Sequence, residues 1–164
     1  MKIITLLENK SSKKNLKSSH GLSLYIEHLG KKILFDLGPN KDFLNNAEKL
    51  NINLKDVDYL IISHGHYDHA TELNFFLNYN TKAKVFISEH AFEKHVGKVG
   101  IIVKDIGIKE VKNKNRLHFI TETLKIDSGI TITPNVLFKE EVLSDERLFV
   151  KKDGEYIKDE FEHE

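Results

Sequence analysis

The sequence of 164 residues contains no cysteine. This absence excludes disulfide bonds and thiolate metal sites, so any bound metal would need histidine and carboxylate ligands. No apolar run approaches the ~18 residues that span a bilayer. The 25 basic and 25 acidic side chains give a formal charge of zero, which argues against a surface that binds polyanions. We therefore expect a small-molecule substrate, and neither a nucleic-acid nor a membrane partner.

The N-terminus has one short apolar stretch, residues 3–7, which predicts a first strand. It is too short for the hydrophobic region of a signal peptide, and no cleavage site of small residues follows, so we expect a cytoplasmic location. Lysines then gather at positions 10, 13, 14 and 17. They favour an exposed loop over residues 8–19, with a local nucleic-acid site as the alternative.

Apolar patterns along the chain predict strands that alternate with helices. The expected strands and β-like runs cover residues 3–7, 22–29, 32–36, 57–62, 84–88, 117–120, 124–126 and 130–133, and a hairpin is expected over 148–156. One helix is expected to begin at Pro39, a second to include residues 73–77, and a third to cover residues 91–96. No repeat or low-complexity linker interrupts this order. It predicts one α/β (α+β) domain over residues 1–164, with a mixed sheet covered by helices.

Residues 64–69 have the sequence His-Gly-His-Tyr-Asp-His and follow a predicted strand directly. Four of them carry ligand-type side chains: His64, His66, Asp68 and His69. Imidazole and carboxylate groups suit Zn²⁺, and also iron or manganese. Gly65 would let the backbone bend closely around an ion. A histidine-rich surface loop is the alternative, but this density of ligands at the end of a strand favours a metal site.

An HxHxDH motif after an apolar strand is the hallmark of the metallo-β-lactamase superfamily, which the chain resembles over essentially its whole length. Further segments resemble one branch of that family. These are residues 7–9, 20–27, 33–38, 46–47, 63–69 and 161–164. The branch contains dihydropterin-methyl-ribofuranosylaminobenzene-phosphate synthases of the methanopterin pathway and many hydrolases without an assigned substrate. The resemblance implies an αββα sandwich, of which this chain resembles roughly the first half.

The same resemblance implies a role for each ligand-type side chain of the motif. His64 and His66 would bind a first metal ion, and Asp68 and His69 a second. Zn²⁺ is the expected ion, with iron or manganese as alternatives. In a complete member the two ions activate a hydroxide that attacks an ester or phosphoester centre, and Asp68 is the catalytic residue that orients this hydroxide.

Two residues outside the motif are further candidates. The resemblance implies that Asp36 holds a ligand imidazole in the right tautomer from behind the site. From the sequence alone, a turn-forming aspartate before Gly38 is an equal alternative. His20 could line the substrate entrance, although an exposed surface histidine is the favoured alternative. The remaining histidines are expected to be structural or exposed: His28, His90, His95, His118 and His163.

The family's remaining metal ligands follow later in a longer chain, and this sequence ends at Glu164 before them. Two protein ligands per ion are fewer than the three that a catalytic zinc normally has. A half sandwich would also expose the apolar inner face of its sheet unless it rearranges, forms a homo-oligomer or meets a partner chain. Three interpretations follow. The chain is a metal-dependent hydrolase that is active when completed, a truncated and inactive product, or one subunit of a split enzyme.

Overall fold

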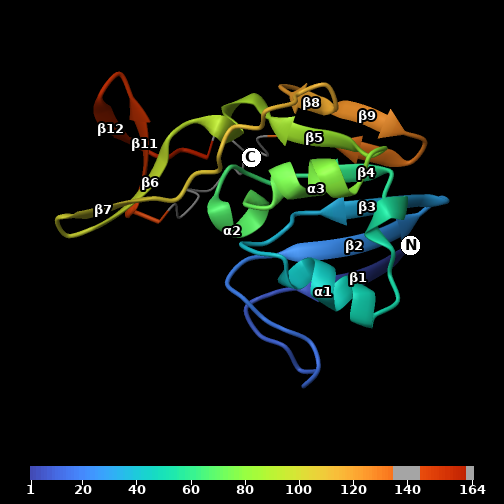
Figure 1. The fold of residues 1–164 in the computed structure, drawn as a ribbon. Coiled ribbons are helices and arrows are strands. Elements are labelled where there is room, and N and C mark those ends of the chain that lie inside the picture. The colour runs from blue at the N-terminus through green and yellow to red at the C-terminus, as the bar shows by residue number, and fades with distance from the viewer. Residues whose placement is uncertain (135–144, 162–164) are drawn as a thin grey trace.

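The computed structural model describes residues 1–134 and 145–161, and its largest element is a six-stranded sheet (Figure 1). The strand order is β1-β2-β3-β4-β5-β8. The bounds are β1 Lys2–Leu7, β2 Ser23–His28, β3 Lys31–Phe35, β4 Tyr59–Ile61, β5 Lys84–Ser88 and β8 Leu117–Ile120. β1, β2 and β3 pair antiparallel, whereas β3, β4, β5 and β8 run parallel. The mixed sheet predicted from the sequence is confirmed.

β2 and β3 form a hairpin. Leu29 and Gly30 form its turn, with φ values of 49° and 76°. Two central residues with positive φ fit the right-handed twist of the flanking strands, and glycine adopts such values without a steric cost. β3 ends at Phe35, so that Asp36 follows at the edge of the sheet where the parallel strands end.

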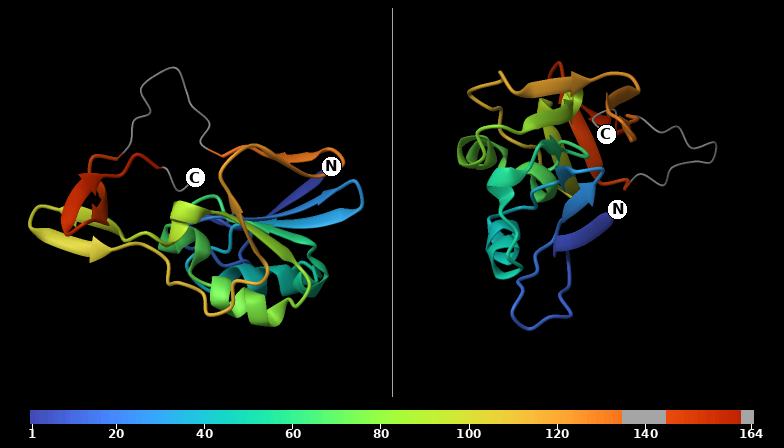
Figure 2. Two further views of the ribbon diagram at one scale, coloured as in Figure 1. Left: turned by 90° about the horizontal axis from the view of Figure 1, so that it is seen from above. Right: turned by 90° about the vertical axis from the view of Figure 1, so that its right-hand side faces the viewer.

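Helices cover one face of the six-stranded sheet. They are α1 (Asp42–Lys49), α2 (Tyr67–Ala70) and α3 (Leu73–Tyr79), with 3₁₀ helices over Leu54–Asp56 and Glu89–Phe92. Seen from above, α1 and α3 lie on the same side of the strands (Figure 2, left). Phe43 of α1 and Phe76 of α3 are fully buried, and they share one apolar core with the strand residues Leu34, Leu60 and Val85. Within the described residues, no helix is long and apolar enough to cross a membrane.

The opposite face of the sheet carries the hairpin of β9 (Leu124–Asp127) and β10 (Ile130–Ile132). Ile130 packs in a second apolar cluster with the sheet residues Ile33 and Phe86. At one end, Tyr59 Oη donates a hydrogen bond to Asp127 Oδ2 over 2.8 Å, and Lys31 Nζ lies 3.1 Å from the same oxygen. The hairpin therefore covers part of the face that we expected to be exposed. The expectation that a second copy or a partner covers this face stays a prediction.

A second sheet of four strands has the order β12-β11-β6-β7. Its strands are β6 (His95–Val99), β7 (Ile102–Asp105), β11 (Leu148–Lys152) and β12 (Glu155–Lys158). The hairpin predicted over 148–156 is confirmed as β11–β12, with positive φ at Asp153 and Gly154. The helix predicted over 91–96 is wrong. A 3₁₀ helix ends at Phe92 and β6 begins at His95, because this segment pairs with β11, some fifty residues later, in a contact that no local pattern indicates.

Candidate metal centre

The histidine motif lies in the connection between β4 and α2 and continues into the helix. Backbone hydrogen bonds fix it on two sides: Leu37 N donates to His69 O over 2.7 Å, and Tyr67 N donates to Ile106 O over 2.8 Å. Leu37 follows β3 in the chain, and Ile106 follows β7. Because the motif itself follows β4, it lies where the carboxyl ends of the parallel strands of the large sheet meet, which is the usual place for ligand sites in open sheets.

Two glycines let neighbouring backbone approach the motif closely. A Cβ atom on Gly65 would lie 2.2 Å from the carbonyl oxygen of Ala91, and one on Gly21 would lie 2.0 Å from the carbonyl oxygen of Asp68. Neither distance is tolerated by real Cβ atoms. Position 65 therefore requires glycine, and in this structure the neighbour that requires it is the backbone of Ala91.

Asp36 lies fully buried behind the motif with φ at 60°, in the left-handed region. That conformation costs a non-glycine residue on the order of 1 kcal/mol, although aspartate adopts it more readily than most. Its Oδ1 accepts a hydrogen bond from Ser63 N over 2.8 Å, and its Oδ2 contacts Ser63 Oγ and His69 Nδ1, each over 2.7 Å. This is the geometry of a carboxylate that orients a metal-ligating imidazole.

These contacts assign the protons of two imidazoles. Ser63 Oγ donates its proton to Asp36, so the same oxygen accepts a hydrogen bond from His64 Nδ1 over 2.8 Å. His69 Nδ1 likewise donates to Asp36. His64 and His69 in their neutral forms therefore carry the lone pair on Nε2, which is the form that binds a metal. Their ring centroids are 4.1 Å apart.

Asp68 lies between His69 and His20. Its Oδ2 is 3.6 Å from His69 Nε2 and 3.3 Å from His20 Nε2. The His20 side chain is 75% exposed, whereas that of Asp68 is 14% exposed. His20 is therefore a surface histidine, as the favoured alternative predicted, and it also contacts the carboxylate of the motif.

His66 faces a different group of residues. Its Nε2 lies 3.5 Å from Oδ2 of Asp159, and Nδ1 of His95 lies 3.2 Å from the same oxygen. All three side chains are buried, and their ligand atoms lie within 4.8 Å of one another. In the part of the chain that the structure describes, these three residues form a group that could hold a metal ion.

No local pattern in the sequence indicates this group. We expected His95 to be structural or exposed and did not single out Asp159. His95 begins β6 and pairs with Val150 of β11, and Asp159 follows β12. Only the long-range pairing of these strands brings His95 and Asp159 to His66. The histidines of the motif, by contrast, are recognisable from their spacing.

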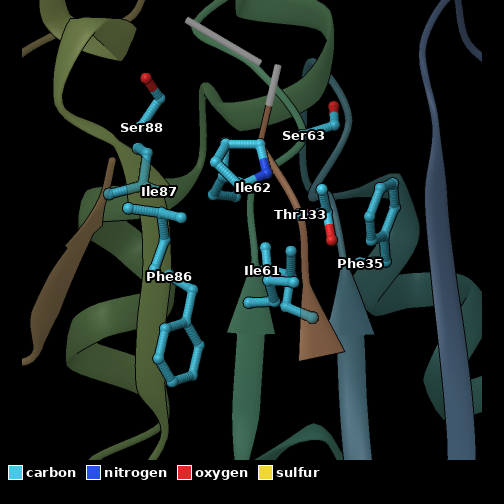
Figure 3. Close-up of a pocket in the computed structure, with 11 residues that line it drawn as sticks. Phe35, Ile61, Ile62, Ser63, Phe86, Ile87, Ser88 and Thr133 are labelled. Atoms are coloured by element: carbon cyan, nitrogen blue, oxygen red, sulfur yellow. The ribbon is translucent and has the colours of Figure 1, made fainter. Parts of the chain in front are cut away.

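Two cavities flank the motif. One of about 430 Å³ has His20, Asp68, Lys98 and Arg147 among its lining residues. Arg147 is paired with Asp145, whose pKa its hydrogen bonds lower to about 2. The other cavity, of about 280 Å³, is lined mainly by apolar side chains of β3, β4, β5, β8 and β10 (Figure 3). Its walls include Phe35, Ile61, Phe86 and Ile120, with Ser63 and Ser88 among the lining residues.

Comparisons with known proteins agree on one family. The family model described as "Metallo-beta-lactamase superfamily" matches residues 18–151. An uncharacterized protein of Methanocaldococcus jannaschii is 35% identical over 163 residues, which cover 96% of this chain and 62% of that protein. The 7,8-dihydropterin-6-methyl-4-(beta-D-ribofuranosyl)-aminobenzene-5'-phosphate synthase of the same organism is 41% identical over 76 residues, which cover 43% of this chain and 26% of the synthase. The predicted resemblance to this branch is confirmed.

A solved structure supports the same fold. Tm1679, described as a metal-dependent hydrolase of the beta-lactamase superfamily, matches 99% of this chain with a TM-score of 0.78 and 27% sequence identity. The predicted fold class is thereby confirmed. The match covers 58% of that chain, so this protein spans about three fifths of the length of the relatives that it matches over nearly its whole length.

Proposed function

Because this chain belongs to the metallo-beta-lactamase superfamily, we propose that it is the metal-binding part of a hydrolase that acts on an ester or phosphoester. One observation carries the proposal: the buried Asp36 carboxylate holds His69 Nδ1 over 2.7 Å and so directs the lone pair of Nε2 away from itself. Carboxylate–imidazole pairs of this kind orient metal ligands. A surface loop rich in histidine needs no such buried partner.

The donor set fits divalent metal ions. His64, His66, Asp68 and His69 offer imidazole and carboxylate groups, which suit Zn²⁺ best and also iron or manganese. Two ions per chain is the number that the family resemblance implies. Bound ions would supply an activated water at neutral pH and polarise the substrate oxygen.

The chain's own residues would do the rest. Asp36 and Ser63 fix the tautomers of His64 and His69, so both imidazoles arrive with Nε2 ready to bind. The Asp68 carboxylate is more exposed than that of Asp36 and lines the 430 Å³ cavity. There it can accept a hydrogen bond from an attacking water and orient it.

Lys98 and Asp145 also line this cavity, and the charge of Lys98 would attract a phosphoester oxygen. Arg147 contributes less, since it is paired with Asp145. We therefore expect Lys98→Gln to raise KM for a phosphodiester several-fold and to leave KM for an uncharged ester unchanged.

The experiment that tests the function is a hydrolysis assay of the purified chain with bis-p-nitrophenyl phosphate and p-nitrophenyl acetate, each with added Zn²⁺, Mn²⁺ or Fe²⁺. Activity with either substrate that disappears in Asp68→Asn supports the proposal. Equal rates in the wild type and Asp68→Asn would refute the role of this carboxylate.

A second candidate is that a partner polypeptide completes the site, because the motif offers two protein ligands for each of two ions and a catalytic zinc normally has three. The chain spans 62% of its uncharacterized relative and 58% of Tm1679. If a second polypeptide supplies further ligands, hydrolysis appears only when the two are combined, and hydrolysis by this chain alone contradicts the candidate.

A further inference from the structure

We propose that His66, His95 and Asp159 bind a divalent cation of the Zn²⁺ type, and that this ion joins the two sheets. The three residues come from three separate segments. His66 belongs to the connection after β4 of the large sheet, His95 begins β6 of the small sheet, and Asp159 follows β12. An ion held by all three would therefore be a cross-link between the sheets.

The distances suit such an ion. Asp159 Oδ2 lies 3.5 Å from His66 Nε2 and 3.2 Å from His95 Nδ1. Ligands at the usual zinc bond lengths of a tetrahedral site are separated by about 3.3 Å from one another. The ligand atoms of the group also lie within 4.8 Å of one another, so a small shift of one ring would complete the geometry.

The hydrogen bonds of His95 point in the same direction. Its Nε2 faces the carbonyl oxygen of His90 at 3.3 Å, which can only accept a hydrogen bond. In the neutral imidazole whose single N–H donates to this oxygen, the lone pair of His95 Nδ1 faces the Asp159 carboxylate at 3.2 Å, as it does in a site that holds a cation between the two groups.

Burial strengthens the case. His95 is 0% exposed, Asp159 1% and His66 6%. Asp159 Oδ1 accepts a hydrogen bond from Phe161 N over 2.9 Å, and its Oδ2 faces the two imidazoles. A divalent cation would add positive charge beside this buried carboxylate, and two imidazoles with one carboxylate form a ligand set that zinc accepts.

This ion would also have more protein ligands than the motif alone offers to each of two ions. The motif alone offers two protein ligands for each ion, whereas His66, His95 and Asp159 together offer three. Since a neutral imidazole has one lone pair, an ion in this group uses His66 in place of the His64–His66 pair that the resemblance implies, while Asp68 and His69 keep theirs. The proposal therefore revises one ligand of the proposed function and does not require hydrolysis.

The test measures metal content and local stability. Purified wild type, His95→Gln, Asp159→Asn and the double variant His64→Gln/Asp68→Asn are loaded with zinc chloride, dialysed and analysed by mass spectrometry. We expect His95→Gln and Asp159→Asn each to lose about one equivalent of zinc, and the double variant to retain that equivalent. His118→Gln, which removes an exposed histidine of β8, is the matched control and should bind as much zinc as the wild type.

Hydrogen exchange of the wild type provides the second readout and avoids variants that fold poorly. Removal of zinc by EDTA should speed exchange in β6 and β11 and leave β2 and β3 unchanged. Wild-type zinc content in both His95→Gln and Asp159→Asn would overturn the proposal and leave the group as a hydrogen-bond network. Unchanged exchange in β6 and β11 after loss of zinc would overturn the cross-linking role. Retention of this zinc in the double variant, together with loss of hydrolysis, would support a site that is separate from the hydrolytic one.

Discussion

The carboxylate of Asp36 accepts hydrogen bonds from Ser63 and His69 while its own backbone is held at a φ of 60°. Strain of this kind persists where the surroundings enforce it, and it tends to occur at functional sites. The interaction explains why the tautomers of the motif are fixed before any ion arrives. The position of Asp36 at the end of a strand indicated this role only together with the family resemblance.

Asp36→Ala removes the partner that orients His69. We expect metal affinity to fall by roughly 10–100-fold, the range typical when such an outer carboxylate is lost. Competition with a coloured chelator measures the change. Asp58→Ala is the matched control, because Asp58 lies before β4, at the other end of that strand, where it contacts Lys32 N. Similar affinities in Asp36→Ala and the wild type would show that His69 is oriented by other groups.

Gly65→Ala places a methyl group 2.2 Å from the carbonyl oxygen of Ala91. Since that neighbour is backbone, the motif or the 3₁₀ helix after β5 must move. We expect weaker metal binding with a stable fold, measured by calorimetric titration with zinc chloride beside a thermal melt. Gly100→Ala is the control for an added methyl group, because a Cβ there has no atom within 4 Å, although its φ of 59° adds some strain of its own. Wild-type zinc affinity in Gly65→Ala would contradict the close fit described here.

The sequence predicts most of the large sheet and, in the small one, the β11–β12 hairpin but not β6 and β7. The strands over β1 to β5 are short apolar runs bounded by turn residues, and their local patterns suffice. The segment from Ala91 to Val96 looks helical by itself, yet it enters β6 because β11 pairs with it. The same long-range pairing brings His95 close to His66 and Asp159, so the missed strand and the missed candidate ligand have one cause.

The β9–β10 hairpin depends on Asp127 for its contact with the sheet. Hydrogen bonds from Tyr59 and Ser128, with Lys31 nearby, lower the pKa of Asp127 to about 2. A carboxyl with a pKa lower in the folded state than its unfolded value of about 3.9 stabilises the fold fully above that unfolded value. This stabilisation is lost as the pH falls from about 4 to about 2.

Asp127→Asn should therefore weaken the pH dependence of unfolding in that window and lower stability at neutral pH. Urea unfolding at a series of pH values measures it, with Asp153→Asn, in the turn between β11 and β12, as the control. If the wild type and Asp127→Asn lose stability in parallel between pH 4 and pH 2, other carboxyl groups govern acid unfolding.

Asn80 joins three segments at the opposite end of the sheet from the motif. Its fully buried side chain donates to Leu54 O and Val57 O, each over 3.0 Å, and accepts from Ala83 N over 2.7 Å. Asn80→Ala leaves these buried groups without their partner, which we expect to cost roughly 3 kcal/mol of unfolding free energy. The exposed Asn78 donates to Asn74 O, so Asn78→Ala should cost less than about 0.5 kcal/mol. Denaturant titration compares the two variants, and equal small losses would contradict this assignment.

At the scale of the whole molecule, the chain combines a sheet with helices on one face and a smaller sheet that supplies His95 and Asp159. The relatives that match it over nearly its whole length are longer, and this chain spans 62% and 58% of them. The family and the motif are readable from the sequence because their residues are close together in the chain. The contribution of the small sheet is not, because it depends on tertiary pairing alone.

Metal binding through the His64–His69 motif and its neighbours underlies every function proposed for this chain. Metal analysis of the purified wild type beside the double variant His66→Ala/Asp68→Ala is the decisive measurement. We predict that the wild type retains zinc, iron or manganese after dialysis and that the variant loses most of it while keeping its circular dichroism spectrum. Equal, near-zero metal in the two proteins would contradict metal binding by the motif.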